Sequence, residues 1–425
     1  MRKQLISLCL ILVLICSFIL SFAGCGGAGE DAAAVGAVDL MTGFVPKVNS
    51  GSQTPISETT AATAADFAAK LLKEAYDGKN VLLSPLSILS ALAMTANGAR
   101  GETLQEMLTA FGVSSIDELN EFFSAYLDRL PNEKNCKLSL ANSIWFRDAE
   151  NLVVKDPFLQ TNADCFRAGA YRAPFDGETV KEINRWVNDH TDGMIDKILD
   201  RITPLSMLYL VNALAFDAKW AMPYTEREQI LKNASFRKED GTYATVTYLQ
   251  DNEYRYLVDG DLAVGFSKPY ADQRFAFVAL RPNDGVTVED YIATLSGEKI
   301  VSLLRNAQKT SVETRLPKFE TRYSIELSAV LSAMGMPLAF TDDADFTGIT
   351  DSVPLKIGNV RHKTFISVGE AGTRAAAVTL VEMKCTAASP EYQPPKVYLD
   401  RSFVYMLVDT ETNFPFFIGT LNDPS

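Results

Sequence analysis

Histidine is almost absent from this chain, whose 425 residues include only His190 and His362. Hydrolysis by an activated serine or cysteine needs a histidine beside the nucleophile, and zinc catalysis needs several ligands at set spacings. The sequence also contains no G-x-S-x-G, H-E-x-x-H or Walker A motif. We therefore expect a protein that is not an enzyme and that holds neither a metal nor a cofactor.

Cysteine is scarce as well, with six in the whole chain and no C-x-x-C pair. Cys9 and Cys16 lie in an N-terminal apolar run, so few are left to build a disulfide framework of the kind that holds small secreted domains together. Cys136 and Cys165 are a possible pair, which the sequence by itself does not decide.

A basic face is also missing. The net charge is −13, and acidic and basic residues are interspersed rather than grouped in blocks. This excludes the basic patch of a nucleic-acid-binding protein and indicates a soluble body. With 47% hydrophobic residues, the chain can bury a large core. Because no repeat or second linker interrupts residues 61–425, we expect one domain there.

The first 60 residues differ from the rest. Residues 1–24 begin with two basic residues and continue as an uncharged apolar run, which is typical of a secretory signal peptide, although the run is long enough to span a membrane. The end of this run resembles a bacterial lipobox, in which Cys25 is lipidated, with Phe22 where leucine is usual. Residues 25–60 are rich in small residues and predict a flexible, lipid-anchored tether. We expect a lipoprotein on the extracellular face of the cell membrane, or a secreted protein.

One stretch near the C-terminus has an unusual pattern. Over residues 369–385, a period of two places uncharged side chains on one face and charged ones on the other. This pattern is typical of a strand that enters a sheet with one covered face, yet the next ten residues, Thr-Ala-Ala-Ser-Pro-Glu-Tyr-Gln-Pro-Pro, predict an exposed loop. For the stretch alone, an alanine-rich linker or short surface helix is the alternative. The uncharged face comprises Thr373, Ala375, Ala377, Thr379, Val381 and Met383.

The sequence around this stretch resembles the serpin family. In that family the hinge of the reactive loop has Glu, then Gly-Thr, then small residues, and the matching positions here are Glu370, Gly372, Thr373, Ala375, Ala376 and Ala377. Residues 399–405 resemble the family's signature strand and residues 413–419 its terminal strand. Further matches are collinear along the body, at residues 80–87, 98–103, 141–145, 211–213, 316–319 and 344–349. Ser402 stands where proline is usual, and Arg374 where glutamate is common.

The resemblance implies a fold. The chain places most helical patterns in its first half and most strand patterns in its second, which indicates an α+β class. The serpin fold sharpens this to three β-sheets, about nine helices and an exposed C-terminal reactive-centre loop at about residues 370–395. Serpins also have a polar cluster that holds two central strands of the main sheet together, and a tryptophan where the loop begins to enter that sheet. The matching residues are Ser84, Ser87, Asn212 and His362 for the cluster, and Trp220 for the tryptophan.

The resemblance also implies a function. An inhibitory serpin is a monomer that traps an extracellular serine or cysteine protease as a covalent acyl-enzyme when its cleaved loop inserts into the main sheet. The family's spacing from the hinge points to cleavage between Thr386 and Ala387, and the alternative is the bond between Lys384 and Cys385. The other candidate function is that of a non-inhibitory serpin, acting as a surface carrier, chaperone or adhesion protein.

Overall fold

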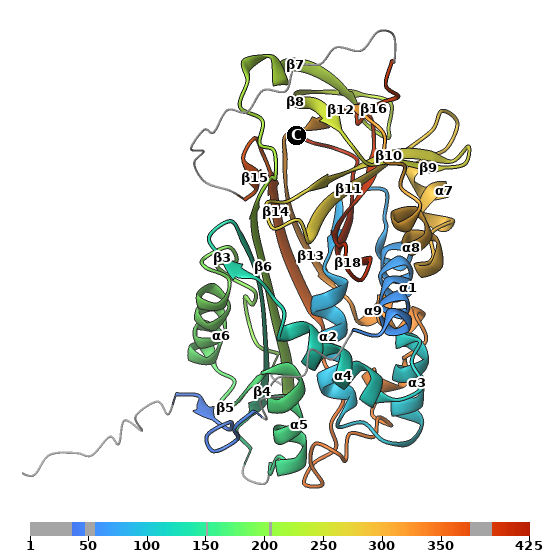
Figure 1. The fold of residues 1–425 in the computed structure, drawn as a ribbon. Helices are drawn as coiled ribbons and strands as arrows, with labels where there is room; N and C mark the ends of the chain where they lie inside the picture. Colours follow the sequence, from blue (N-terminus) through green and yellow to red (C-terminus); the bar gives the residue numbers. More distant parts are fainter. Residues whose placement is uncertain (1–35, 47–55, 150–151, 204–205, 375–392) are drawn as a thin grey trace, which may run out of the picture. The chain divides into compact units, whose positions relative to one another are not determined.

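Nine helices and three sheets make up the part of the chain that the computed structural model describes, namely residues 36–46, 56–149, 152–203, 206–374 and 393–425 (Figure 1). Gly36–Ser425 forms a single unit. These counts confirm the predicted α+β class with three sheets. None of the described helices is both long and apolar enough to cross a membrane.

The helices come mainly from the first half of the chain, as predicted. The longest, α1, has 18 residues, whereas the three after residue 200 have six to nine residues each. Their bounds are α1 Glu58–Ala75, α2 Pro85–Ala96, α3 Gly101–Phe111, α4 Ile116–Leu127, α5 Asp156–Phe166, α6 Gly177–His190, α7 Val288–Ala293, α8 Gly297–Arg305 and α9 Ser328–Ala333.

The largest sheet has eight strands, in the order β1-β5-β4-β6-β15-β14-β13, with β3 beside β4. Its strand pairs are antiparallel except β4–β5. The strands are β1 Val38–Asp39, β3 Asn132–Glu133, β4 Cys136–Arg147, β5 Gly169–Ala173, β6 Leu208–Lys219, β13 Phe319–Glu326, β14 Arg361–Val368 and β15 Gly372–Thr373.

Two smaller sheets complete the fold. The six-stranded sheet has the order β2-β18-β17-β11-β10-β9, and the four-stranded sheet has the order β16-β12-β8-β7. The central strands β17 and β18 are buried along their whole length, as their continuous apolar runs require. The bounds are β2 Val81–Leu83, β7 Ile230–Arg237, β8 Tyr243–Glu253, β9 Tyr256–Asp259, β10 Ala263–Pro269, β11 Phe275–Pro282, β12 Val312–Pro317, β16 Lys396–Tyr398, β17 Phe403–Asp409 and β18 Phe414–Leu421.

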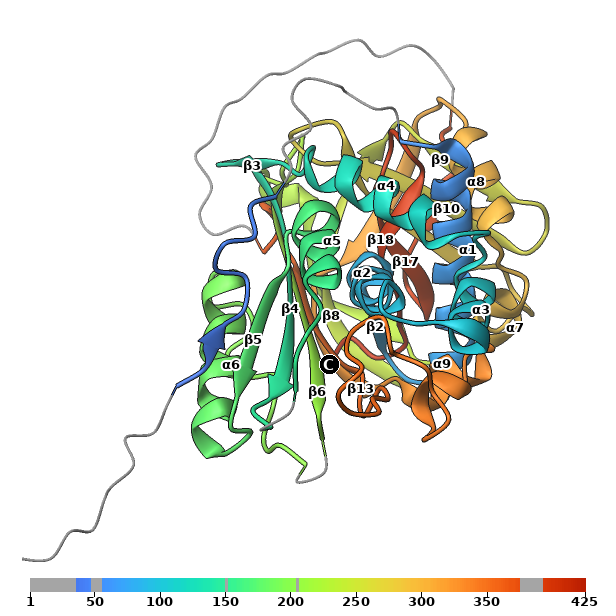
Figure 2. The same ribbon diagram turned by 90° about the horizontal axis from the view of Figure 1, so that it is seen from below.

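Helix α2 lies between the eight-stranded and six-stranded sheets (Figure 2) and contacts both β6 and β18. All 12 of its residues are buried, which suits a helix that is apolar on every side. Its first turn is fixed by the sequence: the Ser84 hydroxyl oxygen accepts a hydrogen bond from the Ser87 backbone N–H at 3.2 Å, and Pro85 occupies the first helical position. This turn therefore has a defined place beneath the main sheet.

Residues 36–46 do not behave as the tether that their composition predicts. Val38 and Asp39 form β1 on the edge strand β5, and the backbone N–H of Leu40 donates to the Ala170 carbonyl at 2.8 Å. Leu40, Met41 and Phe44 pack against the main core. These few apolar residues are spread among Gly, Thr and Ala, so their contribution was hidden in the average composition. Among the described residues, the packed unit therefore begins at Gly36 rather than at residue 61.

Candidate functional site

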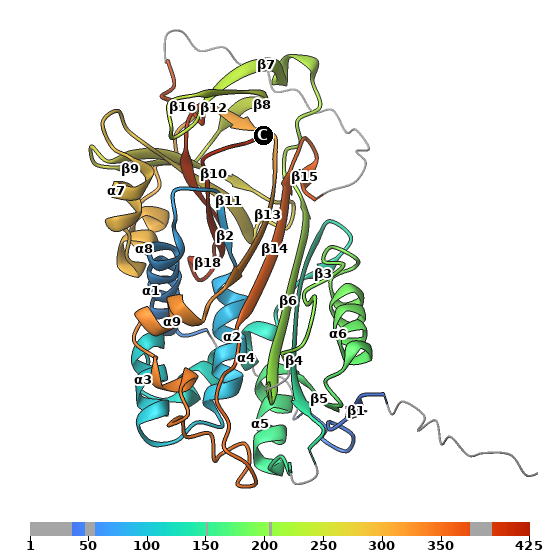
Figure 3. The ribbon, with the colours of Figure 1, turned by 180° about the vertical axis from the view of Figure 1, so that it is seen from behind.

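The predicted hinge enters the centre of the eight-stranded sheet. Gly372 and Thr373 form β15, which pairs with β6 on one side and β14 on the other (Figure 3). The registers place Thr373 opposite both Ala218 and Val368. A Cβ at Gly372 would lie 2.1 Å from the Ala218 carbonyl oxygen, so only glycine fits where the new strand begins.

Thr373 and Arg374 point to opposite sides, as the period of two predicts. The Thr373 side chain is buried, and its hydroxyl lies 2.5 Å from that of Tyr270. Arg374 has a positive φ of 53°, and its backbone N–H donates to the Ser367 carbonyl at 2.7 Å. Ala375, Ala376 and Ala377, and both candidate cleavage sites (Thr386–Ala387 and Lys384–Cys385), lie outside the described residues.

Trp220 contacts the turn between β14 and β15. Its indole N–H donates to the Gly369 carbonyl at 2.8 Å, and its backbone N–H donates to the Ala371 carbonyl at 3.0 Å. Between these two, the Glu370 carbonyl accepts a hydrogen bond from the Tyr224 backbone N–H at 3.0 Å. Three consecutive hinge carbonyls are thus bound by one short segment of the chain.

The Glu370 side chain forms an ion pair with Lys318, which lies between β12 and β13, with 2.7 Å between Nζ and Oε1. Partial burial raises the pKa of Glu370. The hydrogen bond from Lys318 and its positive charge lower that pKa, and the net shift is downward. Both side chains are more than one-third exposed, so the pair orients the hinge glutamate and contributes little to stability.

The four residues predicted to hold the central strands form one chain of hydrogen bonds. His362 Nε2, on β14, accepts from the Ser84 backbone N–H at 3.0 Å. Ser84 caps α2 through Ser87, whose hydroxyl donates to the Asn212 side-chain oxygen on β6. The Asn212 amide then donates to the Asn142 side-chain oxygen on β4. The first turn of α2 therefore connects β14 to β6 and β4.

This connection matters because of how the central strands pair. Among the strands that the structure describes, β6 and β14 are joined through the two residues of β15 rather than by a ladder of their own. Below β15 the link between them runs through side chains and the start of α2. A link of that kind can be broken without unpairing β6 from β4 or β14 from β13.

Burial lowers the pKa of His362 to about 3, because the charged imidazolium would lose its hydration. Its Nε2 faces a backbone N–H donor, so that nitrogen is unprotonated and the neutral ring carries its proton on Nδ1. The same contact prevents His362 from activating the Ser84 hydroxyl. His190 lies elsewhere, stacked on Trp186 with their ring centroids 4.1 Å apart.

Several residues of this site were not predicted. Asn142 lies opposite Asn212 in the β4–β6 register, and a lone asparagine in an apolar strand was the available signal. Tyr224, Tyr270 and Lys318 carried no such signal. Cys136 and Cys165 do not form a disulfide, and burial raises the pKa of Cys136. Among the described residues, no group of three or more His, Cys, Asp or Glu side chains could hold a metal ion.

Comparison with known proteins gives a consistent result. A family model described as Serpin (serine protease inhibitor) matches residues 62–424. An uncharacterized serpin-like protein of Thermococcus kodakarensis is 33% identical over 365 residues, which cover 84% of this chain and 84% of that protein. Alpha-1-antiproteinase of Rattus norvegicus is 29% identical over 388 residues, which cover 88% of this chain and 91% of that protein.

Solved structures are similar over nearly the whole body. The native state of tengpin, a thermophilic serpin, superposes with a TM-score of 0.85 at 42% identity and covers 92% of this chain and 100% of that one. A complex of thyroxine-binding globulin with thyroxine superposes with a TM-score of 0.76 at 26% identity, covering 86% of this chain and 100% of that one.

Proposed function

This chain belongs to the serpin family, and on that premise we propose that it inhibits a protease by acting as a suicide substrate. The target is an extracellular serine or cysteine protease that takes the loop at residues 370–395 as its substrate. The protease nucleophile attacks the scissile carbonyl, the peptide C–N bond breaks, and the new amine leaves with a proton while the acyl-enzyme remains. Loop insertion then carries the tethered protease across the sheet and distorts its active site.

The observation that supports the proposal is the position of β15, whose two residues pair between β6 and β14, where an inserted strand would begin. Its registers with β6 and β14 are already set. Continuing both registers would place Ala375 between Phe216 and Ile366, which are both buried. A small side chain fits on that covered face, whereas a charged one would be costly to bury.

The same registers extend to the polar cluster. They would bring Thr379 level with Asn212 on β6 and His362 on β14. A threonine hydroxyl can both donate and accept a hydrogen bond, so it could replace the link that has to part when the strands separate. Unpaired buried polar groups are costly. The inserted strand therefore offers partners to the very groups whose contacts its entry breaks.

The strongest test combines cleavage with two matched variants. The purified protein is mixed with a panel of serine and cysteine proteases, and a covalent high-mass band on a denaturing gel supports inhibition. Thr373→Arg forces a cation under the covered face of the sheet, so we expect loop cleavage to continue while the covalent band is lost. Arg374→Glu changes the neighbouring side chain, which points outward, and should keep the band.

Cleavage should also stabilise the protein. Each added backbone hydrogen bond contributes about 1 kcal/mol net, and an inserted strand gains them along both edges. We expect the loop-cleaved form to melt roughly 10 °C or more above the intact form. Equal melting temperatures, or equal behaviour of the two variants, would contradict the insertion mechanism.

We infer the reactive bond from family spacing, as Thr386–Ala387. A small β-branched residue before the bond suits a protease with a small primary pocket, whereas Lys384–Cys385 would suit a trypsin-like enzyme with a carboxylate in that pocket. Mass spectrometry of the released C-terminal peptide separates them: a start at Ala387 supports the first bond, and a start at Cys385 supports the second.

The alternative function, a non-inhibitory carrier, is favoured by the likeness to thyroxine-binding globulin. Small-molecule carriers need an apolar pocket of about 300–1,000 Å³. A cavity between α8 and the six-stranded sheet, lined in part by Leu257, Val278 and Leu304, holds only about 10 Å³. A larger depression of about 410 Å³ beside α8 is lined largely by polar residues, including Asp259, Glu298 and Lys299. Clean loop cleavage with no covalent band would support this alternative.

We further propose that Cys25 carries the lipid that anchors the protein to the outer face of the cell membrane. Cys25 lies outside the described residues, so the proposal rests on the lipobox-like sequence. Cys25→Ala should leave the protein unprocessed, or move it from the membrane fraction into the medium. Unchanged processing and membrane partition would instead indicate a signal anchor.

A further inference from the structure

A buried ion pair lies directly behind the hinge. Lys268, on β10, and Glu253, at the end of β8, are 1% and 7% exposed, and their Nζ and Oε1 atoms are 2.6 Å apart. The pair joins the six-stranded sheet to the four-stranded sheet. A buried position is unusual for an ion pair, because the free-energy cost of removing two charges from water is about as large as the gain from their mutual attraction. An ion pair in such a place adds little stability over apolar side chains of the same size, so its value lies in what it positions.

Two aromatic rings complete the surroundings of the Lys268 ammonium. Its nitrogen lies 4.4 Å from the centre of the Tyr224 ring and 5.6 Å from that of Trp220. Trp220 is also stacked on Tyr270, with ring centroids 4.6 Å apart and planes 11° from parallel. A cation held over an aromatic face attracts it, and the attraction is strongest where water is excluded. Lys268 therefore restrains both Tyr224 and Trp220.

These are the two residues that bind the hinge. Between them they donate hydrogen bonds to the carbonyls of Gly369, Glu370 and Ala371. The end of β10 is also tied to the same segment, since the Ala221 backbone N–H donates to the Pro269 carbonyl at 3.0 Å. A continuous set of contacts thus runs from the ammonium of Lys268 to the turn from which β15 starts.

We propose that Lys268, neutralised by Glu253, is a positioning residue for the hinge. It holds Trp220 and Tyr224 in place, so that the turn at residues 369–371 stays in the register from which the loop continues into the sheet. The consequence of this role rests on the proposed inhibitory function. If the protein is an inhibitor, a correctly positioned hinge lets the loop insert before the acyl-enzyme is hydrolysed.

The test uses two double variants of the full chain. Lys268→Met with Glu253→Gln removes both charges at nearly constant volume, which avoids leaving one buried charge unpaired. Lys299→Met with Asp259→Asn is the matched control. That pair joins helix α8 to strand β9 and likewise lies beside an aromatic ring, with Nζ and Oδ2 2.8 Å apart and Nζ 5.5 Å from the centre of the Tyr291 ring.

Hydrogen exchange of the intact protein gives the direct readout. In the Lys268 double variant, we expect the amides of Trp220 and Tyr224 to exchange about tenfold faster, with the Ser84 amide unchanged. The control variant should leave the amides of Trp220 and Tyr224 at the wild-type rate. Wild-type exchange at both amides in the Lys268 variant, or equal acceleration in both variants, would overturn the proposal.

Inhibition kinetics test the consequence. The Lys268 double variant should be cleaved at the wild-type second-order rate, because the loop itself is unchanged, while several-fold more molecules are consumed for each protease trapped. Unchanged consumption would overturn the claimed role in insertion. If the wild-type protein traps no protease, it is the proposed function that fails, and the exchange comparison still decides whether Lys268 positions the hinge.

Discussion

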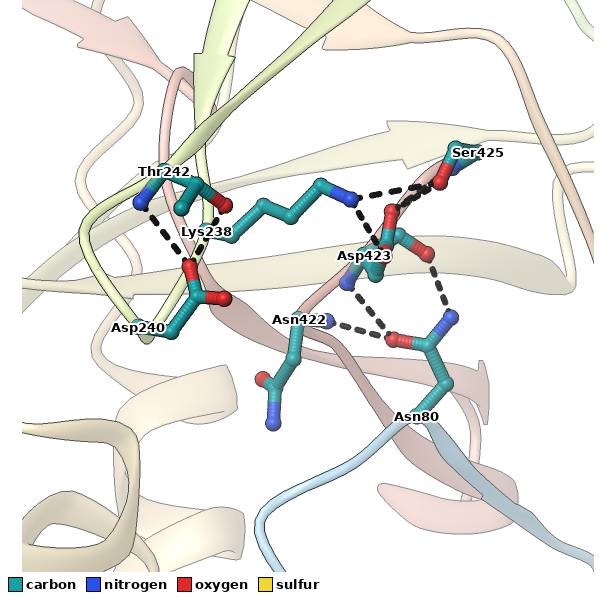
Figure 4. A network of polar contacts seen from close by, with 7 residues as sticks. All are labelled: Asn80, Lys238, Asp240, Thr242, Asn422, Asp423 and Ser425. Atoms are coloured by element: carbon teal, nitrogen blue, oxygen red, sulfur yellow. Dashed lines mark hydrogen bonds and ion pairs between the residues drawn. The ribbon is translucent and has the colours of Figure 1, made fainter.

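Two polar networks join distant parts of this chain, and they are built differently. At the C-terminus, the Asn80 side chain binds the backbone of both Asn422 and Asp423 (Figure 4). The Asn422 amide adds contacts to the Tyr76 hydroxyl and to two backbone carbonyls, and Lys238 forms an ion pair with Asp423. We call this set of residues the C-terminal anchor.

In the network beneath the main sheet, neighbouring residues are joined by one hydrogen bond each, whereas residues of the C-terminal anchor make several. His362, Ser84, Ser87, Asn212 and Asn142 form a series in which each contact joins one residue to the next. Below β15, loss of the His362–Ser84 or the Ser87–Asn212 contact removes the link that this series makes between β14 and β6. Redundant contacts hold the C-terminal strand permanently, whereas a series of single contacts permits the two central strands to part in one step. Both networks are polar, so the number of independent hydrogen bonds between two elements, rather than their polarity, distinguishes a connection that stays closed from one that can open.

The largest effect should come from acid. Because the pKa of His362 is about 3 in the folded state and about 6.5 when unfolded, only the unfolded chain takes up the proton between these values. Stability from this group is complete above pH 6.5 and falls by about 1.4 kcal/mol per pH unit below it, or about 3 kcal/mol by pH 4.

His362→Gln keeps an acceptor for the Ser84 N–H and does not titrate. Denaturant unfolding at pH 7 and pH 4 should show the wild type losing about 3 kcal/mol more than this variant. Equal losses would mean that His362 is hydrated or charged in the folded protein.

Asn212→Ala should have the next largest effect, because it removes the middle of the series and the contacts of the Ser87 hydroxyl and the Asn142 side-chain oxygen. We expect a loss of about 2–3 kcal/mol in the free energy of unfolding. The backbone amides of β6 should also exchange with solvent faster than they would if exchange occurred only through global unfolding. Loss of stability without this local opening would argue against a series of single links.

Asn80→Ala tests the anchor at its most connected residue. The other contacts of the C-terminal anchor remain in this variant, and the groups that lose Asn80 are partly open to water. We therefore expect the free energy of unfolding to fall by only about 1 kcal/mol. Faster exchange should be confined to the amides of Asn422 and Asp423. If this variant also loosened β6, the two networks would not be independent.

Lys238→Met should have the smallest effect. The side chains of Lys238 and Asp423 are 22% and 44% exposed, and pairs of that kind contribute at most about 1 kcal/mol. The difference from wild type should shrink further in 1 M salt, since screening weakens the pair. A salt-independent loss would show that the lysine acts through packing of its stem.

Much of the fold could be anticipated. The cap at Ser84 and Pro85 and the apolar run of α2 depend on local chemistry, so both features can be recognised in the sequence itself. The end of the tether could not be predicted, because Leu40, Met41 and Phe44 weigh little in the composition of residues 25–60 as a whole, although they are enough to pack against the core. The polar cluster was found only through family resemblance, since Ser84 and His362 are 278 positions apart.

Lys268 shows where sequence reasoning stops. A lysine within an apolar strand indicates that its charge needs a partner, but no spacing rule identifies Glu253, which lies on another sheet. The same holds for Asn142, whose partner is set by the β4–β6 register. Such pairs depend on how sheets stack, and that is decided by the whole core.

The hinge shows most clearly which features the sequence determines and which depend on the tertiary structure. The sequence alone determined which side chains share a face, because alternation along an extended chain has a period of two whatever the strand pairs with: Thr373 points inward and Arg374 outward. Only the tertiary structure decided that Gly372 and Thr373 pair between β6 and β14. Backbone hydrogen-bonding groups are the same at every residue, so an alternating pattern specifies a face and leaves the choice of neighbouring strand to the packing around it.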